Sequence, residues 1–271
     1  MRLGDGIMGG PIRYALDGFM ADIHLVHCSY HKCLTVYYSR VMSAVFNRCL
    51  PWSRGYRHFN SHLRDFYAGF RQYRIASVNN RYPDLEQLNE FRMSRFVRDP
   101  RDLVVSGYFY HRRGAEAWTR IEAPSAEDWY FANGSVPEGM REEEISFAEY
   151  LQSLPEEEGL LAELEFRRHH FESMSQWPTL HPNIVTYRYE DIIGHEKQVF
   201  GELFEFYGLG PVERTLAHGF VQRYAINKQA ADAHVRNPNP GQWRKHFSPR
   251  VKRQFDASYR ALVRQLGYPV D

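Results

Sequence analysis

Short apolar runs and longer stretches with helical periodicity follow one another along the chain. After Thr35, the apolar positions Tyr37, Val41 and Val45 recur at the spacing of one helix face. Four apolar runs predict strands, at Ile23–His27, Arg74–Val78, Met93–Val97 and Asn183–Tyr187. Seven segments are predicted to be helices: Thr35–Asn47, Arg101–Arg112, Phe147–Leu154, Glu156–Ser175, Glu196–Tyr207, Pro211–Val221 and Pro249–Leu266. Because strands that alternate with helices form parallel sheets, the pattern predicts an α/β fold in three layers, with helices on both faces of a central parallel sheet.

The predicted elements extend over the whole chain, which indicates a single domain at residues 1–271. After the second predicted helix the periodicity is lost, and Gly114–Arg141 is rich in Trp, Gly, Pro and acidic residues. We interpret this stretch as an insertion or lid near residues 114–145. Its aromatic side chains either wall a binding pocket or belong to the core, and they are Trp118, Trp129, Tyr130 and Phe131.

Lys32 stands in the short turn between the first predicted strand and the first predicted helix. Such a turn leaves the free N–H groups of the first helical turn pointing into one concavity, which favours an anion such as phosphate or sulfate. Lys32 adds a full positive charge there, and Thr35 adds a hydroxyl donor. The alternative is a solvated lysine ahead of an ordinary helix. The turn contains no glycine, so it differs from the GxxxxGK[ST] loop that wraps a triphosphate.

A second boundary between a strand and a helix, within residues 95–113, also carries cationic side chains. Asp99 suits the N-cap and Pro100 suits the first helical position, so Arg98 lies at the end of a strand beside a helix start. Its guanidinium can bind a phosphate through two hydrogen bonds, and Ser106 follows roughly two turns further along the helix. The alternative is an ordinary helix start with solvated arginines.

A third cationic segment, residues 234–248, contains several prolines, a glycine and two asparagines, which forbid a regular element. Arg236, Arg244 and Lys245 concentrate positive charge there, with Trp243 between them. This loop is either a lid over an anionic ligand or a basic surface turn. The three segments together predict a ligand with two separated anionic groups.

The overall charge is nearly balanced, because 34 basic residues stand against 33 acidic ones and the net charge is +1. This balance gives no global attraction to nucleic acid or to an anionic membrane. No run of about 18 apolar residues predicts a membrane span. Cys28, Cys33 and Cys49 form neither a paired framework nor a CxxC motif, so we expect reduced thiols, a cytoplasmic location and no metal site.

These motifs resemble the signatures of the PAPS-dependent sulfotransferases, which transfer a sulfuryl group from 3'-phosphoadenosine 5'-phosphosulfate (PAPS) and release PAP. The signature PKSGTTW is similar to HKCLTVY at residues 31–37. The signature RxPxDxxVSxYxxH is matched by residues 98–111 with every spacing kept. RKGxxGDWK is similar to residues 236–244, and a YED element recurs at residues 189–191. The four motifs follow the family's order and span most of the chain.

The resemblance implies a P-loop-like fold that binds PAPS and needs no metal. Lys32 would hold the 5'-phosphosulfate together with Thr35. Arg98, Ser106 and Arg236 would bind the 3'-phosphate. The remaining expected contacts of the donor, including two tyrosines that would flank the adenine, are His31, Cys33, Leu34, Val36, Tyr37, Tyr189 and Asn237.

The sequence departs from the family where the general base is expected. The KTH element of the cytosolic members has no counterpart in Arg74–Asn80, and Lys32–Asn47 contains no Glu of the kind that carbohydrate-acting members use. The resemblance implies that Lys32 stabilises the charge on the bridging oxygen of the leaving group. The base must come from elsewhere, with His58 and His62 as the nearest upstream candidates, or the acceptor must be acidic enough to need little help. The acceptor would be a hydroxyl, phenol or amine of a small molecule, lipid or carbohydrate. The alternatives are a P-loop kinase that uses ATP and a sensor that binds PAP or another nucleotide without turnover.

Overall fold

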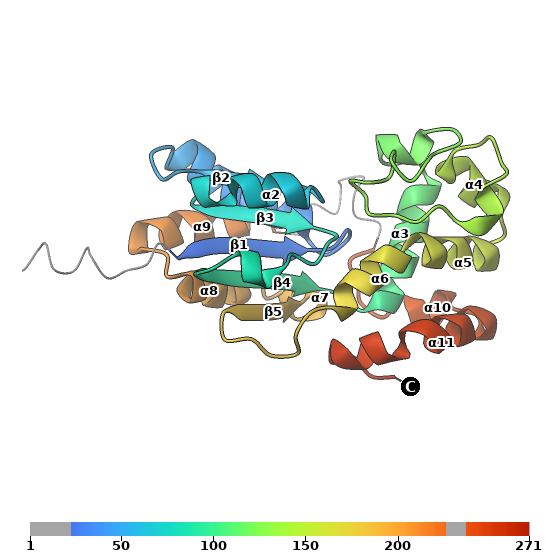
Figure 1. Ribbon diagram of the computed structural model, residues 1–271. Helices are drawn as coiled ribbons and strands as arrows, with labels where there is room; N and C mark the ends of the chain where they lie inside the picture. The colour runs from blue at the N-terminus through green and yellow to red at the C-terminus, as the bar shows by residue number, and fades with distance from the viewer. Residues whose placement is uncertain (1–22, 226–236, 271) are drawn as a thin grey trace, which may run out of the picture.

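A five-stranded parallel sheet forms the centre of the computed structural model, which describes residues 23–225 and 237–270 (Figure 1). The strand order is β2-β3-β1-β4-β5. The strands span Tyr56–His58 (β2), Ile75–Asn79 (β3), His24–Ser29 (β1), Phe91–Val97 (β4) and Ile184–Arg188 (β5). The predicted central parallel sheet is confirmed, and all four predicted strands are present with shifts of one or two residues at their ends. β2 was missed because three residues are too few to show a period.

Alternate residues of the strands enter two hydrophobic clusters, one on each face of the sheet. Leu25 and Phe96 belong to the larger cluster, which includes side chains of α1 (Thr35–Met42), α8 (Glu196–Tyr207) and α9 (Pro211–Arg223). Val26 and Met93 belong to the smaller cluster, which includes Phe66 of α2 (Leu63–Gly69). Helices therefore cover both faces, as the fold class requires.

The other helices gather beyond the carboxyl edge of the sheet, on the side to which the strand arrows point (Figure 1). They are α3 (Pro100–Arg112), α4 (Phe147–Ser153), α5 (Glu156–Phe166), α6 (Arg168–Ser175), α10 (Trp243–His246) and α11 (Pro249–Gln265). A short helix, α7 (Tyr189–Ile192), follows β5 directly. We call the group of α3 to α6 with α10 and α11 the helical half.

Two predicted helices and one predicted loop differ from the structure. Residues 234–248 were expected to contain no regular element, but Trp243–His246 form α10, because the prolines and the glycine of this segment all precede it. The helix predicted over Thr35–Asn47 is α1 continued by a π-helical segment, Ser43–Cys49. The helix predicted over Glu156–Ser175 is interrupted at Arg167, whose φ and ψ are −82° and 2°. The side chain of Arg167 is fully buried and pairs with Glu163 at 2.8 Å. An apolar pattern that continues through this point cannot show the interruption.

The segment predicted as an insertion or lid packs largely against the helical half. Trp118 stacks on Phe166 with ring centroids 5.2 Å apart, and Trp129 is fully buried. Tyr130 and Phe131 are exposed. No helix within the described ranges combines the length and the apolar composition needed to cross a bilayer.

Candidate active site

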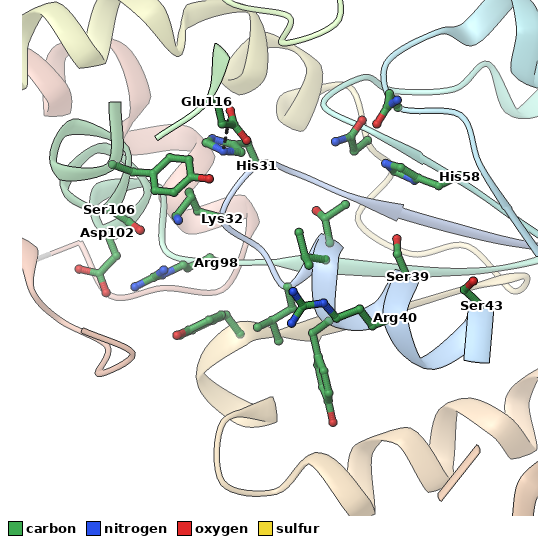
Figure 2. A pocket seen from close by; sticks show the side chains of 18 of the residues that line it. His31, Lys32, Ser39, Arg40, Ser43, His58, Arg98, Asp102, Ser106 and Glu116 are labelled. Atoms are coloured by element: carbon green, nitrogen blue, oxygen red, sulfur yellow. Dashed lines mark ion pairs between the residues drawn. The ribbon is translucent and has the colours of Figure 1, made fainter. Parts of the chain in front are cut away.

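A cavity of about 770 Å³ lies at the carboxyl edge of the sheet, and the ends of all five strands contribute to it. In the order of the strands across the sheet, the lining residues at the strand ends are His58 (β2), Asn79 (β3), Lys32 (β1), Arg98 (β4) and Tyr189 (β5). Because neighbouring strands lie about 4.8 Å apart, this row spans roughly 19 Å. Figure 2 shows His58 on one side of Lys32 and Arg98 on the other. We call these two sides the β2 end and the β5 end of the cavity.

The turn that carries Lys32 has an uncommon backbone. Lys32 and Leu34 have φ angles of 71° and 63°, in the left-handed region that favours glycine. The His31 N–H donates a hydrogen bond to Asn80 Oδ1 at 2.7 Å, which ties the turn to the end of β3. Leu34 is the N-cap residue of α1, and no side chain caps the helix there. Since Leu34 and Thr35 both line the cavity, the free N–H groups of α1 are available to an anion.

Lys32 is the cation at the middle of the row. Its Nζ lies 3.7 Å from the centroid of the Tyr110 ring. Burial and the positive charges of Arg98 and Arg113 together lower the pKa of Lys32 to about 7, although Glu116 opposes this shift. An anion bound beside Lys32 would raise this pKa again, because a negative neighbour favours the ammonium form.

Arg98, Ser106 and Tyr189 come together at the β5 end of the cavity. Arg98 is only 4% exposed, and its guanidinium carbon lies 4.1 Å from the centroid of the Tyr189 ring. The Tyr189 hydroxyl donates to the Pro238 carbonyl at 2.8 Å. Ser106 approaches the same region from α3 (Figure 2). A guanidinium fork, a hydroxyl and an aromatic ring are groups suited to a phosphate beside a planar base.

Asp102 fixes the third cationic segment against this end of the cavity. Its two carboxylate oxygens accept hydrogen bonds from the N–H groups of Gly241, at 2.6 Å, and Trp243, at 2.9 Å. Asn237, one of the predicted donor contacts, lines the cavity. Arg236, another, lies outside the described residues. Asp102 belongs to the RxPxDxxVSxYxxH motif, so the structure explains a motif position for which the motif alone indicated no role.

His31 and Glu116 form a pair next to Lys32 that the sequence did not predict. Glu116 Oε2 lies 3.6 Å from His31 Nε2 (Figure 2). Burial lowers the pKa of His31 to about 4, so the ring is neutral at pH 7. Burial by itself would raise the pKa of Glu116, but the neighbouring His31 and the Trp118 indole hold it well below its usual range. Glu116 is thus a carboxylate among cations. No motif marks it, because it lies in the aperiodic stretch after α3.

Three side chains of this region have ligand atoms close enough to hold a metal ion. His31, His111 and Glu116 each offer one such atom, all within 4.8 Å of one another. His111 Nδ1 lies 2.7 Å from the buried carboxylate of Glu163. The rings of His31 and His111, however, are stacked at 5.2 Å and only 8° from parallel, so their in-plane lone pairs do not converge on one tetrahedral ion. The cluster therefore fits charge balance around Lys32 better than metal binding.

His58 lines the β2 end of the cavity, whereas His62 is not among the described residues that line it. His58 Nδ1 lies 2.8 Å from Ser77 Oγ, and the Tyr56 hydroxyl lies 2.6 Å from the same oxygen. Ser39 Oγ extends this chain of polar groups, at 2.8 Å from the Tyr56 hydroxyl. Burial lowers the pKa of His58 to about 4, so the imidazole is neutral at pH 7. When Nδ1 donates to Ser77, the lone pair of Nε2 is left to accept a proton.

Of the remaining residues predicted to contact PAPS, some line the cavity and one lies in the core. Val36 lines the cavity and is 54% exposed. Tyr37 also lines it, although its hydroxyl donates to the Val221 carbonyl of α9 at 2.9 Å. Cys33 is fully buried in the larger hydrophobic cluster. Most of the residues predicted to contact PAPS therefore line one cavity, whereas Cys33 is buried and does not line it.

The fold and the cavity together define a class of protein. It is an α/β protein in which cationic side chains line a ligand site at the carboxyl edge of a parallel sheet. The family model of the sulfotransferase domain matches residues 22–267, and the chain therefore belongs to the sulfotransferase family. The assignment as a sulfotransferase, made from the motifs, is confirmed by this match.

Solved structures of similar fold include a retinol dehydratase in a complex with retinol and PAP. It is 14% identical, with a TM-score of 0.50, over 90% of this chain and 83% of that chain. A mouse sulfotransferase complexed with PAP is also 14% identical, with a TM-score of 0.47, over 93% of this chain and 88% of that chain. The first likeness confirms the P-loop-like α/β fold. A search among curated proteins found no match.

Proposed function

We propose that the chain transfers the sulfuryl group of PAPS to a hydroxyl, phenol or amine of an acceptor. Lys32 and the N-terminus of α1 hold the 5'-phosphosulfate. Arg98 and Ser106 hold the 3'-phosphate, and Tyr37 and Tyr189 flank the adenine. The presence of PAP in the retinol dehydratase structure supports this choice of donor.

The observation that carries the proposal is the order of side chains along the sheet edge. Lys32 follows the central strand, with Arg98 towards the β5 end and His58 towards the β2 end. A donor whose 3'-phosphate lies at Arg98 and whose phosphosulfate lies at Lys32 directs its sulfur towards His58. An acceptor hydroxyl between the sulfur and His58 then meets the in-line geometry of group transfer.

In the proposed reaction, a bond forms from the acceptor oxygen to sulfur as the bond from sulfur to the bridging phosphate oxygen breaks. Lys32 stabilises the negative charge that develops on this bridging oxygen as PAP leaves. His58 Nε2 takes the proton of the acceptor, because the ring is neutral at pH 7 with a pKa of about 4. Ser77 holds the other ring nitrogen and so fixes the orientation of the base.

The donor and the reaction are tested by two measurements on the full chain. Calorimetry should show that PAP binds and that ATP binds more weakly. Labelled PAPS, incubated with a panel of phenols, sugars and amines, should yield a labelled sulfate ester or sulfamate. Binding of ATP in preference to PAP would instead indicate the kinase. Binding of PAP without transfer to any acceptor would indicate the sensor.

The base is tested by a pair of histidine variants. His58→Gln should lower kcat by about 100-fold or more, the usual contribution of a general base, and leave the affinity for PAP unchanged. His62→Gln is the matched control, since His62 is not among the described residues lining the cavity. A larger loss of kcat in His62→Gln than in His58→Gln would overturn the assignment of the base.

We also propose that the chain acts as a single cytoplasmic domain in which the segment near 114–145 closes one side of the cavity. One hydrophobic cluster extends from Leu25 of the sheet to Phe147 of the helical half, which supports a single domain. Glu116 of the segment lines the cavity. The three cysteines are free thiols, as is usual in a reducing compartment.

A further inference from the structure

Both ends of the cavity carry arginines, but they differ in whether a carboxylate lies beside them. At the β2 end the charged lining residues are three arginines, Arg40, Arg48 and Arg57. The carboxylates that line the cavity within the described part of the chain are Asp102 of α3, which Figure 2 shows near Arg98, and Glu116, which it shows beside His31 and next to Lys32. The proposed mechanism places the acceptor at the β2 end. Among the described residues, this end is lined by arginines and by no carboxylate, so it is positively charged.

The first helix directs polar groups along this end. Arg40, Ser43 and Asn47 line the cavity at spacings of three and four residues, so they lie along one side of α1 and its π-helical continuation. Figure 2 shows Arg40 and Ser43 on the same side of Lys32 as His58. Arg57 immediately precedes His58 in β2. Arg57 also lines the cavity, so a second arginine besides Arg40 belongs to the part of the wall that carries the proposed base.

The proposed donor does not account for these arginines. Its phosphosulfate is met by Lys32 and the N-terminus of α1, and its 3'-phosphate by Arg98 towards the β5 end. Arg40, Arg48 and Arg57 lie at the other end, and all three are exposed. Arginine binds carboxylate, sulfate and phosphate groups through its planar fork of donors, whereas it contributes little to the binding of an apolar molecule.

We infer that the acceptor carries an anionic group, a carboxylate, sulfate or phosphate, in addition to the group that receives the sulfuryl. This inference rests on the proposed function, because that function defines which end receives the acceptor. The hydroxyl and amide side chains between the arginines, Ser39, Ser43 and Asn60, suit a hydroxylated molecule such as an acidic saccharide. Electrostatic attraction makes the binding of such an acceptor sensitive to ionic strength.

The charge is tested with two acceptors that differ in nothing else, a glucuronate-containing oligosaccharide and the same oligosaccharide after carboxyl reduction. With labelled PAPS, kcat/KM should be about tenfold or more higher for the carboxylated form, and this preference should shrink as NaCl is added. A sulfated and a phosphorylated monosaccharide, each beside its neutral parent, identify the preferred anion. Equal or better use of the neutral members of all three pairs would overturn the inference.

Calorimetry of the complex with PAP separates this inference from the proposed function, because binding does not require transfer. The anionic oligosaccharide should bind this complex, and its carboxyl-reduced form should bind about tenfold more weakly. Salt-sensitive binding without transfer would contradict the proposed function, while an anion site at the β2 end would remain supported. Transfer to neutral phenols, with no preference for an anionic acceptor, would support the proposed function and contradict the inference about the acceptor.

Two charge-matched double variants locate the effect. Arg40→Gln/Arg57→Gln should raise KM for the carboxylated acceptor by about tenfold or more, with the Kd for PAP within about twofold of the parent value. Arg64→Gln/Arg264→Gln is the control, since both arginines are exposed and neither lines the cavity. An unchanged KM in the first variant would overturn the inference. An equal rise in the Kd for PAP would do so too, because the arginines would then serve the donor.

Discussion

At the scale of single residues, the proposed contact of Lys32 with PAPS or PAP predicts that binding depends on pH. Burial and the neighbouring Arg98 lower its pKa to about 7 in the unbound protein. A bound anion favours the ammonium form, so the pKa is higher in the complex. By linkage, the affinity for PAP is full below pH 7 and falls as the pH rises above 7, by about tenfold per pH unit until the pKa of the complex is reached. Calorimetry with PAP between pH 7 and 9 measures this slope, in a range where phosphate groups, with a second pKa of about 6, hardly titrate.

The control for this dependence is Lys32→Arg. A guanidinium stays charged over the whole range, so this variant should bind PAP with an affinity that is nearly independent of pH. Lys32→Ala should abolish transfer at every pH. An affinity of the parent protein that stays constant from pH 7 to 9 would show that Lys32 is not the group that meets the donor's charge.

At the scale of elements, the conformation of the turn before α1 depends on the strand beside it. Asn80, just after β3, has a φ of 60° and accepts the His31 N–H at 2.7 Å. Asn80→Gly permits the same backbone conformation and removes this hydrogen bond. We expect the affinity for PAP to fall by up to about tenfold, because the turn loses a contact that holds it in its binding conformation. Calorimetry measures the affinity, and denaturant unfolding measures the accompanying loss of stability.

Asn89→Gly is the matched control for this variant. Asn89 also has a positive φ, of 53°, but it is exposed and is not among the residues lining the cavity. The two variants therefore make the same chemical change in similar backbone conformations. If both lowered the affinity for PAP equally, the hydrogen bond from His31 would have no specific part in donor binding.

Elements with a long buried face could be predicted from the sequence, and short ones could not. α3, α8 and α11 repeat their apolar residues over several turns, so periodicity located them to within a few residues. β2, with three residues, and α10, with four, are held by their neighbours in space rather than by a pattern of their own. The same limit hid the interruption at Arg167, which depends on a buried ion pair.

At the scale of the whole molecule, the sequence indicated the cationic residues of the cavity that lie in motifs, but not the residues that reach the cavity only through packing. Lys32 and Arg98, which we propose bind PAPS, lie in motifs at the ends of long strands, where a turn into a helix marks an anion site. His58 could be suggested only as a nearby histidine, since its place in the cavity depends on the pairing of β2 with β3. Glu116 and Arg57 carry no motif at all. Their position beside the cavity follows from packing between distant segments.

Packing of the helical half depends on a buried ionic cluster, and Gly107 of α3 provides the space for it. Glu163 of α5 lies 2.7 Å from His111 Nδ1 and 2.8 Å from Arg167 Nε, and all three side chains are fully buried. A Cβ added at Gly107 would overlap both Glu163 and Arg167. Gly107→Ala must therefore displace paired charges that have no solvent to receive them, and we expect a loss of about 3 kcal/mol in the free energy of unfolding.

Gly219→Ala separates this packing effect from the effect of alanine on the unfolded chain. Gly219 lies within α9, and an added Cβ there has no atom within 4 Å. Alanine should stabilise that helix by about 0.5–1 kcal/mol. Because both variants restrict the unfolded chain alike, the difference between their unfolding midpoints in urea reports the space around the cluster alone. Equal midpoints would mean that α3 and α5 can separate without cost. The helical half would then not be a rigid support for Ser106 and Tyr110, the α3 side chains that line the cavity.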